Sequence, residues 1–240
     1  MGTSQSHNLK TGPNWARAKR SITKIARRAG NDDYSCKSFV VNFSKAIGDN
    51  VYRSNGKSQH ATFGTSGAKI TKNLISFVNS VRQDGLNTVL GNIDVASPLS
   101  KDVFVHSILK RVIGEPDSTM DNDAAIVSLD KLLNEIFADC EDQKQIENKI
   151  TLASSDEIVC WIVNFEVDYI LEYSGELFQS HIFDKCDNPS VVMRQIKTWL
   201  HKELDSKLHD KLISKDLSSN EGQQILDNLT SEILEIWKQE

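Results

Sequence analysis

The sequence is poor in residues that build covalent or metal-bound frameworks. Its four cysteines lie far apart without a CxxC pair, so neither a disulfide framework nor a zinc site is indicated. Scattered thiols fit a reducing compartment, and we expect a cytoplasmic protein. No run approaches 18 apolar residues and the N-terminus has no apolar signal segment, so we expect neither a membrane span nor secretion.

Catalytic motifs are also missing. The sequence has no GxSxG, no Cys/His nucleophile arrangement and no HExxH pair. His201, Asp205 and His209 recur every four residues and would share one helical face, but a solvated face is the simpler interpretation. We therefore expect a protein that is not an enzyme and that holds no metal or cofactor.

Helical periodicity, by contrast, runs through most of the chain. Apolar residues recur at steps of three and four, which predicts an all-α multi-helix bundle. We expect a flexible leader over residues 1–13, a basic-to-acidic helical part over 14–152, and a C-terminal helical part over 153–240 packed on the same core. The most apolar segment, 156–173, is rich in β-branched residues. Its aromatic residues keep a four-residue step, which favours a buried helix over a strand.

Several local features of the bundle are predicted from single residues. Ser154 or Ser155 is expected to cap the apolar segment, and Val103 and Val127 are expected to face the core. A turn is expected over 117–121, with Asp121 and Asp123 acting there as turn and capping residues. The stretch Gly64 to Lys69 opens a helix, and its Thr65, Ser66 and Gly67 form either a phosphate site or only a helix cap.

The most distinctive stretch is the first predicted helix, which is amphipathic and basic. Asn14 is expected to cap it and Gly30 to end it. Its apolar stripe consists of Trp15, Ala18, Ile22, Ile25 and Ala29. The opposite face offers five cations to an anion or an acidic partner: Arg17, Arg20, Lys24, Arg27 and Arg28.

The net charge of −5 conceals a strong asymmetry along the chain. Residues 1–80 hold 13 of the 28 Lys and Arg residues but only three of the 33 acidic residues. Such polarity is typical of a chain whose one end meets nucleic acid or an acidic protein. The alternative is self-complementarity, in which the basic end packs on the acidic end of the same molecule.

The first six residues, MGTSQS, allow two specific interpretations. They fit the pattern for N-myristoylation of Gly2, with Ser6 in the last place, although that modification needs a eukaryotic setting. An untethered tail without function is the plain alternative. The second interpretation comes from a family resemblance.

The chain resembles the QatB family of the bacterial Qat anti-phage defence system. The resemblance covers much of the first 140 residues and is carried by the order and spacing of five features. They are MGTS at the start, Trp15-Ala16-Arg17 opening the basic helix, Gly64-Thr65-Ser66, Asp84-Gly85-Leu86-Asn87 and the segment 117–137. The leader here is shorter and poorer in proline than in that family, and the last 90 residues match only in helical character.

The resemblance implies a set of partners rather than a reaction. Qat systems encode an ATPase, a TatD-like nuclease and a QueC-like enzyme of the QatC type. Such QueC-like enzymes resemble protein-modifying catalysts that join a deazaguanine to an N-terminal glycine through an amide. Carried over to this chain, the resemblance implies Gly2 as the acceptor and Thr3 and Ser4 as its recognition context. A nucleic-acid-binding module that uses the basic helix is the alternative function.

Overall fold

The computed structural model describes residues 12–27, 33–48, 50–54, 62–91, 101–115, 117–184 and 186–240. Within these ranges the chain forms eleven α-helices and one π-helical turn, η2. The helices are α1 (Pro13–Arg27), α2 (Asp33–Ile47), α3 (Thr65–Asp84), α4 (Leu86–Leu90), α5 (Lys101–Ile113), α6 (Met120–Ile136), α7 (Gln143–Thr151), α8 (Ser155–Tyr173), α9 (Gly175–Phe178), α10 (Pro189–Ile213) and α11 (Asn220–Gln239); η2 spans Gln179–Phe183. The predicted all-α bundle is confirmed.

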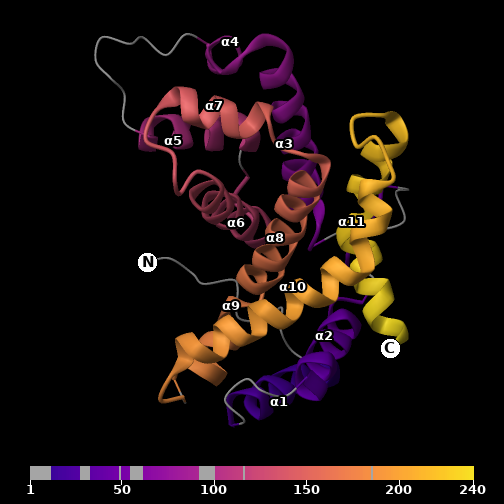
Figure 1. The fold of residues 1–240 in the computed structure, drawn as a ribbon. Coiled ribbons are helices and arrows are strands. Elements are labelled where there is room, and N and C mark those ends of the chain that lie inside the picture. Colours follow the sequence, from indigo (N-terminus) through magenta and orange to yellow (C-terminus); the bar gives the residue numbers. More distant parts are fainter. Residues whose placement is uncertain are drawn as a thin grey trace.

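The helices are arranged around α8 and α3. Helix α8 packs against α6 and α10, while α3 packs against α6 and α11. Figure 1 shows α4, α5, α6 and α7 gathered at one end of the molecule and α1 and α2 at the other, with α10 crossing between them. The basic predicted helix, α1, therefore lies at an end of the bundle rather than inside it.

Helix α8 is the most deeply buried element, as the apolar segment predicted. Thirteen of its residues are buried, including Trp161, Phe165 and Tyr169. A helix that is apolar around most of its circumference is stable only when it is covered on most sides. The core cluster to which it belongs runs from Trp15 to Trp237 and so draws on both sides of position 152.

Ser154 caps α8 in a reciprocal arrangement. Its hydroxyl accepts a hydrogen bond from the backbone N–H of Glu157 at 3.2 Å, and the Glu157 carboxylate accepts one from the backbone N–H of Ser154 at 2.8 Å. This capping box satisfies two backbone donors at the helix start. Of the two serines that the sequence offered, Ser154 is the cap and Ser155 is the first helical residue.

Three of the local predictions are wrong. Asn14 is not a cap, because α1 begins one residue earlier at Pro13 and the Asn14 amide donates to the carbonyl of Lys45 at 3.1 Å. Val103 and Val127 are 38% and 42% exposed rather than inward. Both lie at the border of an apolar stripe, where a rotation of the helix by a few tens of degrees decides which side is buried.

The boundaries of two helices also differ from the expected ones. Helix α6 begins at Met120, inside the predicted turn, because the Thr119 hydroxyl accepts from the backbone N–H of Asn122 at 3.1 Å. Within the predicted C-terminal helical part, the segment from Gly175 to Phe183 is not one continuous α-helix but divides into α9 and η2. A π-helical turn carries one more residue per hydrogen-bonded ring than an α-helix and marks a local irregularity.

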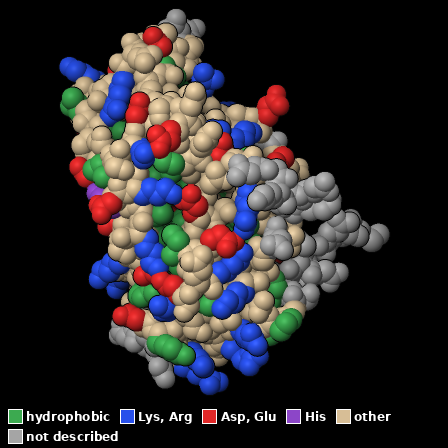
Figure 2. Space-filling view, turned by 90° about the vertical axis from the view of Figure 1, so that its right-hand side faces the viewer, with side chains coloured by type: hydrophobic (Ala, Val, Ile, Leu, Met, Phe, Trp, Pro, Cys, Tyr) green, Lys and Arg blue, Asp and Glu red, His purple; other side chains and the backbone are tan. Residues whose placement is uncertain are grey.

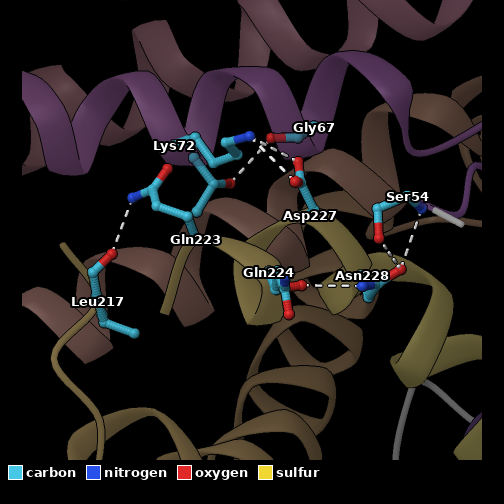
Figure 3. Close-up of polar contacts among 9 residues, drawn as sticks. Ser54, Gly67, Lys72, Leu217, Gln223, Gln224, Asp227 and Asn228 are labelled. Atoms are coloured by element: carbon cyan, nitrogen blue, oxygen red, sulfur yellow. Dashed lines mark hydrogen bonds and ion pairs between the residues drawn. The ribbon is translucent and has the colours of Figure 1, made fainter. Parts of the chain in front are cut away.

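Half-buried polar contacts connect helix α11 to α3 and to the segment before it (Figure 3). The Lys72 ammonium group lies 2.9 Å from the carboxylate of Asp227. The Asn228 side chain accepts hydrogen bonds from the backbone N–H and the hydroxyl of Ser54 at 3.1 and 3.0 Å. These contacts tie the segment before α3 and α3 itself to the same C-terminal helix.

Candidate functional site

The basic face of α1 is exposed. Arg17, Arg20, Lys24 and Arg27 are all exposed, and the helix contains no acidic residue. Within the described ranges, none of these four side chains forms an ion pair; the Arg20 guanidinium donates to the carbonyl of Ala16 at 3.3 Å. We call these four residues the basic face. Among the described residues, these four cations share one helix and have no acidic partner.

Apolar and hydroxyl contacts hold the opposite side of α1 in place. The ring of Trp15 meets Phe43 of α2 edge to face, with centroids 5.8 Å apart. The hydroxyls of Ser21 and Ser38 are 2.9 Å apart. Because α1 is anchored on α2 in this way, its cations are presented on a fixed scaffold.

Other basic residues of the N-terminal third are neutralised inside the molecule. Lys37 pairs with Glu240 at 3.3 Å, and Arg53 pairs with Glu235. Lys72 adds the pair with Asp227 described above. Self-complementarity therefore accounts for part of the charge asymmetry, and the cations of the basic face of α1 are among those that it does not neutralise. Figure 2 shows several Lys and Arg side chains gathered at the end of the molecule where α1 and α2 lie.

The remaining predicted site residues lie outside the described ranges. These are Gly2, Thr3, Ser4 and Arg28. The first described residue is Gly12, which is exposed and whose carbonyl accepts from the backbone N–H of Ala16 at 3.0 Å. The chain thus enters α1 at the surface of the molecule.

The N-terminus of α3 is already occupied by an anion of the chain itself. One carboxylate oxygen of Asp121 accepts from the backbone N–H of Gly64 at 2.9 Å, and the other accepts from that of Ser66 at 2.8 Å. A carboxylate at this place satisfies backbone donors and complements the helix dipole. The phosphate site considered for this stretch is therefore wrong, and Lys69 instead donates to the carbonyl of Glu115 at 2.9 Å.

Asp121 is more than the turn residue that the sequence predicted. It is 6% exposed, and its carboxylate also accepts a hydrogen bond from the hydroxyl of Tyr169 on α8. Burial, followed by the charge of Asp121, raises the pKa of Tyr169 well above its ordinary value. The tyrosine is therefore a neutral donor, and this junction locks α3, α6 and α8 together.

A second buried acid lies near this junction. Glu166 is fully buried on α8 and accepts from the hydroxyl of Thr230 on α11 at 3.1 Å. Burial raises the pKa of Glu166 to about 8. Because neither this carboxyl nor the Tyr169 hydroxyl reaches solvent, both groups hold helices together and are not placed to meet a substrate.

The three residues of the predicted histidine face are not assembled around one centre. His209 lies 3.2 Å from Asp156 of α8 and 3.4 Å from Asp205 of its own helix. His201 joins neither contact. Among the described residues, no group of three or more His, Cys, Asp and Glu side chains is placed to hold a metal ion.

No protein-family model, curated protein or solved structure matches this chain. In the described parts of the chain, no helix is both long enough and apolar enough to cross a membrane. The function must therefore be inferred from the residues themselves.

Proposed function

We propose that this chain is a non-enzymatic component of a bacterial anti-phage defence system of the Qat type. In this proposal it binds a QueC-like enzyme and presents the α-amine of Gly2 for conjugation to a deazaguanine. The observation that carries the proposal is the combination of an MGTS start with a basic helix a short distance behind it. The exposed basic face of α1 supports it, because that face is anchored and lacks acidic partners.

The chemistry requires little of this chain beyond its terminal amine. An α-amine has a reference pKa of about 8, so an appreciable neutral fraction exists near physiological pH. The neutral nitrogen attacks an activated carboxyl carbon on the deazaguanine donor and forms the amide bond. The activating group leaves, and the nitrogen loses one proton. Glycine at this place leaves the attacking nitrogen unobstructed by a side chain.

The distance between Gly2 and the body limits where the partner docks. Ten residue steps separate Gly2 from Gly12, and a fully extended chain of that length spans at most about 35 Å. An enzyme that modifies Gly2 while docked on the bundle therefore has its active site within about 35 Å of Gly12. The basic face of α1 begins directly behind that residue and is the natural docking surface.

A substitution at Gly2 tests this function in cells. We expect Gly2→Val to abolish phage protection by the complete gene set, because the side chain obstructs the attacking amine. Ser6→Ala is the matched control, since it leaves Gly2, Thr3 and Ser4 intact and should protect normally. Full protection by Gly2→Val would refute the proposal.

Nucleic-acid binding by the basic face is the second candidate function. Four exposed cations on one helix favour it. If all four contact phosphates of duplex DNA, the logarithm of the binding constant should fall with the logarithm of salt with a slope of about −3.6. Arg17→Glu with Arg20→Glu should lower the affinity severalfold, whereas Arg111→Glu on α5 should not. A response to salt that is flat would eliminate this function.

A further inference from the structure

A cleft at the junction of α8, η2 and α10 combines four apolar side chains with a ring of charged ones, and most of its exposed surface is apolar. Its volume is about 590 Å³, within the range of about 300 to 1,000 Å³ that is usual for binding pockets. Leu171 and Phe178 form its buried wall, and Phe183 and Met193 line it nearer the surface. Phe183 is 43% exposed and so leaves part of a large apolar ring open to solvent. We call this opening the π-turn cleft.

The charged residues around the π-turn cleft are not equivalent. Lys197 of α10 pairs with the buried carboxylate of Asp168 at 2.8 Å, and Lys131 of α6 pairs with Glu172. The two acids lie one turn apart on α8 and neutralise both lysines. Arg194 is exposed and forms no hydrogen bond or ion pair with any described residue. It is therefore the cation of this cleft that remains available to an external acid.

The unpaired side chains of this opening are of the types found in protein-binding surfaces. Phenylalanine, methionine and arginine are enriched in the centres of protein interfaces, where lysine and the acidic residues are depleted. The unpaired side chains of the cleft, Phe183, Met193 and Arg194, are of those three types, while its lysines and acids are paired with one another. Among the described residues that line the cleft, a nucleic acid would find a single unpaired cation, Arg194.

We propose that the π-turn cleft binds a short acidic segment of a partner protein. In this arrangement an aromatic or aliphatic side chain of that segment packs against Phe183 and Met193. A neighbouring aspartate or glutamate of the segment pairs with Arg194. This inference does not depend on the proposed function at Gly2, because it concerns a different surface and needs no modifying enzyme.

The methionines provide a direct test in the full-length protein. The chain has three, of which Met193 lines the cleft and Met120 lies on α6. With ¹³C-methyl methionine labelling, NMR can follow both methyl groups during titration with six-residue peptides. The probe carries a central Trp-Leu pair flanked by Asp and Glu, and the matched peptide carries Lys at the flanking positions. We expect the acidic peptide to shift the Met193 signal saturably and to leave Met120 unmoved.

Two variants in the cleft and two outside it complete the test. Phe183→Ser and Arg194→Glu should each weaken the acidic peptide by about tenfold or more, and Arg194→Glu should reverse the preference toward the lysine peptide. Val127→Ser on α6 is the control for Phe183, because Val127 is an apolar residue of similar exposure, and Arg111→Glu on α5 is the control for Arg194. Both control variants should leave binding unchanged.

Four results would overturn the proposal. They are no shift of Met193 up to about 1 mM peptide, equal shifts of Met193 and Met120, equal binding of the acidic and basic peptides, and a Met193 signal that moves with protein concentration alone. The last result would make the cleft an interface between copies of this chain.

Discussion

Single buried polar residues couple the helices of this protein, and Glu166 is the most sensitive of them to pH. Its carboxyl group is fully buried, and its pKa is raised from 4.5 to about 8, mainly by burial. The folded state therefore keeps the proton over an interval in which the unfolded chain releases it. Stability contributed by this group is fully present below about pH 4.5 and is lost as the pH rises toward 8.

We expect Glu166→Gln to remove this pH dependence. In the natural protein, each pH unit between 4.5 and 8 lowers the free energy of unfolding by up to about 1.4 kcal/mol through this group. Urea unfolding at pH 5, 6.5 and 8 measures the slope. Glu172→Gln, on the same helix but part-exposed, should retain it, and equal slopes for both variants would contradict the assignment.

Gly67 is required by close packing rather than by backbone conformation. A Cβ atom at this position would lie 2.3 Å from the ring of Tyr169, which is itself stacked on Phe63 with centroids 4.8 Å apart. The ring has no free space to yield. A glycine that could have served an anion-binding loop is therefore needed here for the packing of α3 against α8.

Replacing Gly67 with alanine should therefore destabilise the protein by about 1 to 3 kcal/mol, the usual cost of overpacking a core. Gly175→Ala is the matched control, because a Cβ there meets no atom within 4 Å. That variant should be neutral or slightly stabilising, since alanine favours a helix more than glycine does. The midpoints of chemical unfolding for the two variants measure the difference.

At the scale of elements, the cap of α8 gives a prediction on two adjacent serines. Ser154→Ala should lower the free energy of unfolding by about 1 kcal/mol, because it leaves the backbone N–H of Glu157 without its acceptor. Ser155→Ala, at the first helical position, should have almost no effect. Thermal unfolding of both variants decides between them, and a larger loss for Ser155→Ala would contradict the observed capping.

The elements also show which parts of the structure the sequence can predict. Periodicity located the long helices, and it favoured a helix for residues 156–173 because the aromatic step of four outweighed the β-branched composition. Periodicity failed for Val103 and Val127, because both lie at the border of an apolar stripe, where helical position alone does not determine whether a side chain is buried. It could not assign Asp121, because its partners are backbone groups 57 and 55 residues away.

For the candidate site, the sequence predicted that the basic face is exposed. It could not predict which other basic residues form ion pairs within the molecule. The alternation of cations and apolar residues in α1 is local information, so the four described cations were placed correctly on the outside. The pairing of Lys37, Arg53 and Lys72 with acids near the C-terminus depends on tertiary contacts. The π-turn cleft likewise combines residues of α6, α8, α9, η2 and α10, which no local pattern brings together.

At the scale of the whole molecule, the basic residues of the N-terminal third fall into two groups. One group forms ion pairs within the molecule, and the other is exposed and available for binding. Lys37, Arg53 and Lys72 each form an ion pair with an acidic residue near the C-terminus. The basic face remains, and because its side chains are exposed, removing it should leave the fold intact. In the variant with alanine at Arg17, Arg20, Lys24 and Arg27, we expect the free energy of unfolding to change by no more than about 0.5 kcal/mol per substitution. The same variant should no longer bind the partner that docks on the basic face.

The central claim is that Gly2 accepts a covalent modification from a QueC-like enzyme. Its most direct test is the intact mass of this protein after expression with and without the neighbouring QueC-like gene, followed by mapping of the N-terminal peptide. The account predicts a mass gain that maps to Gly2 and requires that gene. An unmodified N-terminus in both samples would contradict it, and would leave the basic face to be explained by nucleic-acid binding.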